Sequence, residues 1–163
     1  MSKPKGHTPS YSSNIMLKMM GPQDANHYGN VHGGVIMRAA DEAAAISAIR
    51  HCRHNVVTAF MSHMSFETPV HIGDLLILKS QVNFVGKTSM EVGVRIETEN
   101  PVKGECRFVG RAYVTMVALD DRGKPAAVPP LVLETKQDKI RHKRAKQRRE
   151  FRKKLAKERE GIT

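Results

Sequence analysis

One carboxylate stands in a stretch that is otherwise nearly free of polar side chains, and this makes it the first candidate for chemistry. Asp41 lies among alanine and isoleucine residues between Gly33 and His51. Burying an unpaired charge is costly, so Asp41 needs a charged partner or a chemical purpose. One interpretation is a structural ion pair with Arg38, three residues earlier. The other interpretation is catalysis by the carboxylate.

A cluster of polar and small residues precedes this stretch. Asn26, Asn30 and His32 lie just before Gly33-Gly34. Asn caps helices and tolerates left-handed backbone, and an isolated His is usually a hydrogen-bonded structural residue, so all three have a plain structural interpretation. The glycines can serve close packing of a helix on a strand. Alternatively, their bare N–H groups at a helix N-terminus can polarise the carbonyl oxygen of a ligand.

The element that must carry Asp41 is predicted to be a helix. Between Gly33 and His51 the apolar residues fall on nearly every side of a helical turn, which is typical of a buried helix. Arg38 and Glu42 stand four residues apart, and their simplest role is an exposed ion pair that contributes about 0.2–0.5 kcal/mol. The sequence therefore predicts one long helix that holds Asp41 in a buried setting.

Most of the remaining folded sequence is predicted to be β-sheet. Hydrophobic and polar residues alternate between Met90 and Thr98, as a half-buried antiparallel strand requires. Turns are indicated at Gly21-Pro22, at residues 86–88 and at residues 100–104. Strands are expected near residues 14–20, 56–64, 74–84, 90–98 and 106–119. The fold class is then α+β, with one long helix wrapped by a five-stranded antiparallel sheet.

The formal net charge of +11 is concentrated at the carboxyl end of the chain. Residues 136–160 contain 13 Lys and Arg against four Asp and Glu, which is a net +9 and leaves +2 for the rest. Phe151 is the only aromatic residue of the tail, and its apolar residues are too sparse for a coiled coil. We expect a solvated basic helix, with nucleic-acid binding as the alternative.

The chain divides into a flexible start (residues 1–13), one folded domain (14–135) and the basic helical tail (136–163). No apolar run reaches the roughly 18 residues of a transmembrane helix, and the amino end lacks the apolar region of a signal peptide, so a cytoplasmic protein is expected. Cys52 and Cys106 are expected to be reduced, structural thiols. The eight histidines lack the spacing of a metal site, so no metal or redox cofactor is expected.

Several motifs together resemble the hotdog-fold acyl-CoA thioesterases. The first, NHYGNVHGG, begins at Asn26 and is followed by MRAADEA from Met37. Further matches are RHC at residues 50–52, FETPVHIGD at 66–74 and TSMEV at 88–92. Within this family the sequence is similar to the long-chain acyl-CoA hydrolases, including the brain-type enzyme with two tandem hotdog domains. The resemblance covers about residues 14–135.

The resemblance implies a hotdog fold with strand order 1-3-5-4-2, in which two protomers join their sheets edge to edge. It implies hydrolysis of fatty acyl-CoA to free fatty acid and CoA, with Asp41 as general base or nucleophile and Asn30 as its polar partner. The N–H of Gly34 would meet the thioester oxygen. CoA enters only as part of substrate and product, and the residues expected to bind it are His32, Gly33, Gly86, Lys87, Thr88 and Ser89.

Asn30 and Asp41 are too far apart along one chain to share a thioester easily. If the helix starts near Gly33, Asp41 lies about eight residues in, or about 12 Å along the axis, while Asn30 precedes the helix. A two-fold partner with an antiparallel helix can bring the two side chains together. We therefore expect a homodimer as the minimal unit, with Asn30 of one subunit facing Asp41 of the other, and a hexamer built as a trimer of dimers.

Two other functions remain open on the sequence alone. One is a hotdog module that binds acyl-CoA as a sensor without turnover, and the presence of both Asp41 and Asn30 favours turnover instead. The other is a nucleic-acid-binding protein that acts through the basic tail, although the sequence has no recognised nucleic-acid-binding fold. The leading hypothesis is an acyl-CoA thioesterase.

Overall fold

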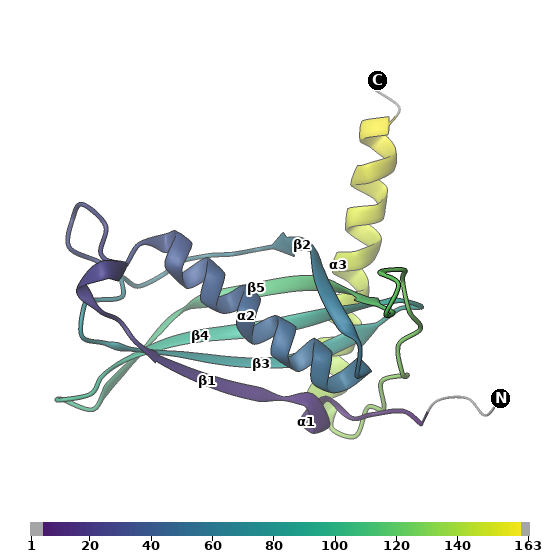
Figure 1. Ribbon diagram of the computed structural model, residues 1–163, viewed down its shortest axis with the longest axis horizontal. Helices are drawn as coiled ribbons and strands as arrows, with labels where there is room; N and C mark the ends of the chain where they lie inside the picture. The colour runs from purple at the N-terminus through teal and green to yellow at the C-terminus, as the bar shows by residue number, and fades with distance from the viewer. Residues whose placement is uncertain (1–4, 161–163) are drawn as a thin grey trace.

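A single antiparallel sheet of five strands wraps around one long helix, α2 (Gly33–Cys52), in the computed structural model of the chain (Figure 1). The structure describes residues 5–160, with side chains through residue 158. None of the helices in this range is both long enough and apolar enough to cross a membrane. The α+β class and the positions of all five strands, to within two residues, are confirmed. The other elements are α1 (Pro9–Ser12), β1 (Asn14–Met19), the 3-10 helix η1 (Pro22–Asp24), β2 (Asn55–Ser62), β3 (Leu75–Val85), β4 (Ser89–Asn100), β5 (Glu105–Leu119) and α3 (Lys136–Glu160).

The order of the strands differs from the expected one. Neighbouring strands follow the order β1-β3-β4-β5-β2, so the expected order 1-3-5-4-2 is wrong in the places of β4 and β5. The cause is the length of the connections, because short turns at residues 86–88 and 101–104 make β3, β4 and β5 consecutive antiparallel partners. As a result, β1 lies at one edge of the sheet and β2 at the other.

Small side chains allow α2 to pack closely on the sheet. The hydroxyl oxygens of Ser47 on α2 and Ser80 on β3 lie 2.8 Å apart across this contact. The opposite side differs from the buried helix that was expected, since Met37, Ile46 and Ile49 are 38–43% exposed. One sheet covers only one side of a helix, so the other side is left for a further partner. The sheet-facing side is lined by alanines at most 2% exposed, namely Ala39, Ala40, Ala43, Ala44 and Ala48.

The amino-terminal segment contacts the folded domain, in contrast to the flexible start that was expected. The ring Nδ1 of His7 lies 2.9 Å from the backbone oxygen of His51, and Arg50 donates a 2.7 Å hydrogen bond to the backbone oxygen of Ser13. Ser12 is fully buried. The last turn of α2 leaves carbonyl oxygens without helical partners, which gives this segment a place to bind. Residues 1–4 lie outside the described residues.

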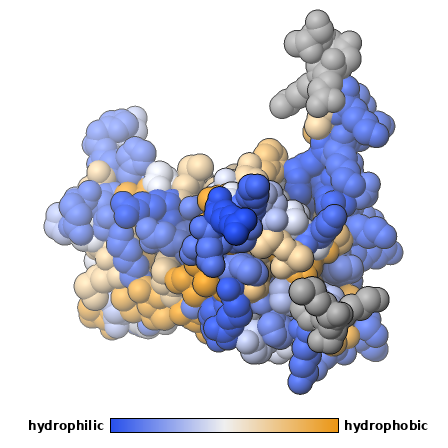
Figure 2. Space-filling model, turned by 45° about the vertical axis from the view of Figure 1, so that its right-hand side comes forward, coloured by the Kyte–Doolittle hydropathy of each residue, from blue (hydrophilic) through white to orange (hydrophobic). Residues whose placement is uncertain are grey.

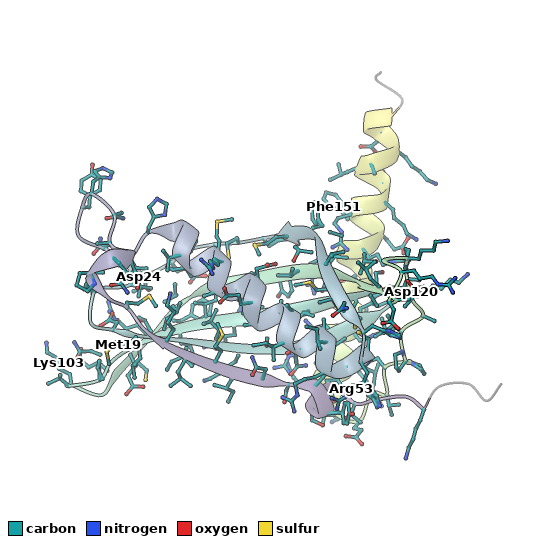
Figure 3. The ribbon with its side chains drawn as sticks, in the orientation of Figure 1. Met19, Asp24, Arg53, Lys103, Asp120 and Phe151 are labelled. Atoms are coloured by element: carbon teal, nitrogen blue, oxygen red, sulfur yellow. The ribbon has the colours of Figure 1, made fainter. Side chains whose placement is uncertain are left out.

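The basic tail forms a helix, as predicted, but one face of its first half packs against the body while most other residues there are exposed. A reciprocal cap starts α3, because Thr135 and Asp138 each accept a 3.0 Å hydrogen bond from the backbone N–H of the other. Beyond this cap α3 lies against β3, and Ala145 is fully buried. Only its last part projects from the body, where Phe151 is 60% exposed (Figure 3) and the surface is mostly hydrophilic (Figure 2).

The docking of α3 has a partner that its own sequence does not reveal. Glu91 on β4 is 3% exposed, and its carboxylate accepts hydrogen bonds from Arg148 at 2.6 Å and from Arg152 at 3.4 Å. The guanidinium of Arg148 also lies 3.6 Å from the ring centroid of Tyr113. Glu91 lies 57 residues before Arg148 in the sequence. The composition of the tail alone therefore did not indicate this contact and suggested a free helix.

Candidate active site

Asp41 lies on the side of α2 that approaches β2, and its partner is a hydroxyl group. Thr58 Oγ1 donates a hydrogen bond of 2.5 Å to Asp41 Oδ1. Arg38 pairs with Glu42 instead, with Nε and Oε1 2.9 Å apart, as expected. Within residues 5–158, no basic group lies within 4.0 Å of the Asp41 carboxylate. The structural ion pair with Arg38 is therefore excluded as the role of Asp41.

Thr58 is a site residue that the sequence did not indicate. Its hydroxyl oxygen also lies 3.4 Å from the sulfur of Met116 on β5. The pairing of β2 with β5 is irregular between Thr58 and Phe60, and such irregularities re-aim side chains. Thr is an ordinary strand residue, so nothing in its local sequence distinguishes it.

The loop before α2 is closed by the side chain of Asn26. Its Oδ1 accepts backbone N–H groups of Tyr28 at 2.9 Å and of Asn30 at 3.2 Å. Gly29 has a φ of 83°, a left-handed conformation that favours glycine and completes the turn. The side-chain NH₂ of Asn26 makes no hydrogen bond to the described part of the chain, so it is free to donate to a ligand.

The side chain of Asn30 is anchored to the loop before β3. Nδ1 of His71 donates a 3.0 Å hydrogen bond to Asn30 Oδ1, which leaves the amide NH₂ group available. The backbone N–H of His71 is bound in turn by the buried carboxylate of Asp74, which pairs with Arg107 at 2.9 Å. His71 lies inside the motif FETPVHIGD of residues 66–74, but its role could not be predicted from the sequence.

A cavity of about 300 Å³ opens between this loop and the start of α2. Asn26, Asn30 and Gly33 line it, together with Phe66 and neighbouring residues up to Val70. A Cβ atom on Gly33 would lie 3.7 Å from the Phe66 ring, so the absence of a side chain keeps this end open. The cavity thus offers two amide groups beside a helix N-terminus, where an anion or a polarised carbonyl is stabilised.

The backbone N–H of Gly34, which was expected to contact the thioester, already donates a hydrogen bond to His32. Nδ1 of His32 accepts a 2.9 Å hydrogen bond from the backbone N–H of Gly34. The ring therefore acts as the N-cap of α2, which is the structural interpretation of this histidine. A ligand oxygen can reach the Gly34 N–H only if the ring of His32 turns away.

The remaining predicted site residues are separated within one chain. Asp41 does not line the cavity that contains Asn30. β3 begins near His71 and Asn30 and ends at the turn of residues 86–89. Its 11 residues span about 35 Å, so this length of strand separates the turn from Asn30. The turn is held by the backbone oxygens of Lys87 and Thr88, which accept N–H groups from residues 128 and 118 at 3.1 and 2.9 Å.

The two cysteines take no part in this site. Both are free, Cys52 is 3% exposed and Cys106 is exposed. Burial raises the pKa of the Cys52 thiol, which keeps it in the unreactive protonated form. The structural interpretation therefore fits Cys52, whereas Cys106 lies at the surface.

Comparison with known proteins identifies the family to which this fold and site belong. A profile described as the thioesterase superfamily matches residues 28–115, which include the end of the loop, α2, β2 to β4 and most of β5. The chain belongs to the thioesterase superfamily. It is therefore a thioesterase, and the hotdog fold expected for the family is confirmed by its structural neighbours.

Two relatives are similar over most of this chain. One is an uncharacterised acyl-CoA thioester hydrolase of Bacillus subtilis, YkhA, at 41% identity over 132 residues, or 81% of this chain and 77% of that protein. The other is the cytosolic acyl coenzyme A thioester hydrolase of Rattus norvegicus, at 36% identity over 89% of this chain. This chain spans 39% of the length of the rat protein. Neither relative is described as binding nucleic acid, so that alternative gains no support.

Solved structures match over nearly the whole chain. A hexameric acyl-CoA thioesterase without ligand superimposes with a TM-score of 0.89 at 36% identity, covering 94% of this chain and 98% of its own. An acyl-CoA hydrolase from Staphylococcus aureus in complex with butyryl-CoA, CoA and CoA disulfide has a TM-score of 0.87 at 35% identity, with 96% and 95% covered. Alanine variants of the Staphylococcus enzyme have been solved at an asparagine, at an aspartate 15 positions later and at a threonine 17 positions after that.

Proposed function

We propose that this chain hydrolyses acyl-CoA to a free carboxylic acid and CoA, with Asp41 as the catalytic carboxylate. The observation that carries the proposal is the Asp41–Thr58 contact. These residues stand 17 positions apart, as do the aspartate and the threonine that were changed in the Staphylococcus aureus enzyme. That enzyme was solved with butyryl-CoA, which supports acyl-CoA as the substrate. Hydrolysis consumes only water and thioester, so we expect no cofactor or metal besides the CoA carried by the substrate.

Asp41 has two possible roles in this reaction. As a general base it takes a proton from water while the water oxygen bonds to the thioester carbon, and collapse of the tetrahedral intermediate breaks the C–S bond. As a nucleophile it forms an acyl anhydride and expels the thiolate, and water then hydrolyses the anhydride. In both cases Thr58 holds one carboxylate oxygen and leaves the other for the reaction, so Thr58 acts as a positioning residue.

The polar partner of Asp41 is one of two asparagines of the loop. The sequence favoured Asn30, whose NH₂ group is left free by the hydrogen bond from His71. The spacing in the Staphylococcus enzyme favours Asn26, which lies 15 positions before Asp41, whereas Asn30 lies 11 before it. Both line the same cavity. We propose that Asn26 faces the substrate and that Asn30 anchors the loop, and separate alanine variants of the two distinguish them by their kcat.

The active unit is proposed to be a dimer joined through β2. Asp41 and the asparagine cavity do not meet within one chain. Around Asp41, the exposed apolar side chains Met37, Val57 and Phe60 and the free edge of β2 form a surface that a second copy can cover. The hexameric relative supports further assembly into a trimer of such dimers.

The other expected contacts remain part of this proposal. The N–H of Gly34 polarises the thioester oxygen once the ring of His32 has turned away, and Gly33 leaves room for the acyl group. The turn from Gly86 to Ser89, which includes Lys87 and Thr88, contacts the pantetheine or phosphate part of CoA. The cytosolic location in the name of the rat relative supports a cytoplasmic setting.

Release of the CoA thiol from acyl-CoA, followed with a thiol reagent, tests the proposed activity. Asp41→Asn is nearly isosteric and is expected to lower kcat by about 100-fold or more. Glu42→Gln is the matched control, because it removes only an exposed ion pair one residue away. Near-normal turnover in folded Asp41→Asn would exclude the carboxylate from catalysis. Binding of acyl-CoA to the wild type without thiol release would identify a sensor instead.

A further inference from the structure

A second cavity, of about 550 Å³, lies between α3 and the face of the sheet opposite α2. β3, β4 and β5 supply its floor, the start of β1 closes one side, and α3 forms a wall across it. The site of Asp41 lies on the other face of the sheet, against α2 and β2. Six of the residues that line this outer cavity are cationic, namely Lys79, Arg95, Arg111, Arg141, Arg144 and Arg148.

Only part of this positive charge is compensated by carboxylates. Lys79 and Arg95 both bind the single carboxylate of Glu97, whose pKa is held below its usual value chiefly by the hydrogen bond from Lys79. Arg148 shares the carboxylate of Glu91 with Arg152. Two carboxylates are thus shared among three cations of the cavity and Arg152.

Three guanidinium groups of the cavity have no acidic partner in the described part of the chain. They belong to Arg111, Arg141 and Arg144, for which no carboxylate of residues 5–158 lies within 4.0 Å. Arg111 lies over the ring of Phe108, and Arg141 donates a 3.1 Å hydrogen bond to the side-chain oxygen of Gln81. Like charges held this close repel one another, and a ligand with several negative charges relieves that repulsion.

The wall that carries two of these arginines is fixed in place before any ligand binds. Glu91 and Arg148 are 3% and 16% exposed in their side chains, and their ion pair ties the middle of α3 to β4. Six residues before Arg148, the ring of His142 stacks on Phe84 at a centroid distance of 5.3 Å and makes a 3.2 Å hydrogen bond with the backbone oxygen of Asn83. The cationic side chains therefore start from a fixed backbone, which lowers the ordering cost of binding.

We propose that this outer cavity is a binding site for a small anion that carries a chain of two or three phosphates. Guanidinium groups bind phosphate oxygens through paired hydrogen bonds, and three separate groups match several phosphates better than a single carboxylate. The volume is in the range of small-molecule sites. A site walled by a helix and a sheet admits a phosphate chain, whereas a duplex nucleic acid or a membrane needs a broad, flat surface.

Calorimetric titration of the full-length protein with sodium tripolyphosphate tests this proposal. The variant Arg141→Gln with Arg144→Gln removes two unpaired cations and is expected to weaken binding by about tenfold or more. The matched control is Lys143→Gln with Lys146→Gln, which removes the same charge from exposed positions of α3 outside the cavity. The control is expected to weaken binding by less than about threefold, through general electrostatics. Thermal melting verifies that both variants remain as stable as the wild type.

A parallel titration with CoA, which carries an adenosine diphosphate unit, distinguishes two sources of the phosphate chain. Weakening of both ligands by the first variant assigns the phosphate end of CoA to the cavity, and weakening of tripolyphosphate alone assigns a separate anion. No measurable tripolyphosphate binding by the wild type, or equal weakening by both variants, would overturn the proposal. Because binding is measured without turnover, the result is independent of whether acyl-CoA hydrolysis is found.

Discussion

Thr58 reaches Asp41 from a strand that begins only after α2 has ended, and its single hydroxyl orients the candidate catalytic group. The hydrogen bond occupies Oδ1 of Asp41, so the geometry of the free oxygen depends on it. Because the site faces the free edge of β2, small errors in orientation would displace the carboxylate from the substrate position proposed at the subunit interface.

Thr58→Val is therefore expected to lower kcat by about 10- to 100-fold while KM changes much less, since the shape is kept and only the hydroxyl is lost. Steady-state kinetics of thiol release measures both constants. Thr115→Val is the control, because the buried hydroxyl of Thr115 has no hydrogen-bond partner among the described residues. Equal effects of the two variants would mean that Thr58 has only a structural role.

Residue types in the sequence singled out Asp41 and Asn30 as candidates but not their hydrogen-bond partners. Burying a carboxylate within an apolar helix is costly, and the neighbouring residues in the sequence are enough to show this. Thr58 and His71 are ordinary residues for a strand and a loop, and each meets its partner only after the chain folds back, 17 and 41 residues away. The occupied N–H of Gly34 was likewise hidden, because it depends on the rotamer of His32.

At the scale of elements, α3 is the part of the molecule whose role differs most from the expected one. The tail was expected to be a solvated helix, because a highly charged helix offers few core contacts. Glu91 changes this expectation, since removing α3 would strip the arginines from a carboxylate that is 3% exposed. The positions of the strands and of α2 could be predicted from hydrophobic periodicity and turn residues. The docking of α3 could not, because it depends on the ion pair between Glu91 and Arg148, which are distant in sequence.

Arg148→Met is expected to destabilise the fold by about 2–4 kcal/mol, because it leaves a buried carboxylate with a weaker partner. Urea denaturation measures the free energy of unfolding. Arg149→Met is the control, since in the described part of the chain the ion pair of Arg149 is with the exposed carboxylate of Glu150, and its guanidinium lies over the Phe84 ring. The effect should stay below about 1 kcal/mol. Adding Glu91→Gln to Arg148→Met should recover part of the loss, and a neutral Arg148→Met would contradict the proposed anchoring of α3.

At the scale of the whole molecule, His51 joins segments from three regions of the chain. It lies on the last turn of α2, its Nε2 makes a 3.1 Å hydrogen bond with the backbone oxygen of Pro129, and its own backbone oxygen lies 2.9 Å from the ring of His7. Burial is the main reason why the pKa of His51 lies below its ordinary value of 6.5. The neutral ring is thus the form that the fold prefers.

Protonation of His51 is expected to destabilise the folded protein in mild acid. A pKa that is lower in the folded than in the unfolded state means that the unfolded chain binds the proton more readily, so stability is present above pH 6.5 and is lost as the pH falls below it. The free energy of unfolding should decrease between about pH 7 and about pH 5, and His51→Gln should flatten this slope. An unchanged slope would exclude His51 as the group responsible.

The proposed active site depends on assembly, because Asp41 does not line the cavity that contains Asn26 and Asn30 within one chain. Coexpression of two inactive chains tests it, one with Asn26→Ala and Asn30→Ala, the other with Asp41→Asn. With random pairing, about half of the dimers are mixed, and each mixed dimer has one site with both native components, so about a quarter of all sites are restored. We predict thiol release near a quarter of the wild-type rate, with mixed dimers verified by mass spectrometry. Activity no higher than that of the two parent variants, despite mixed dimers, would contradict a site shared between subunits.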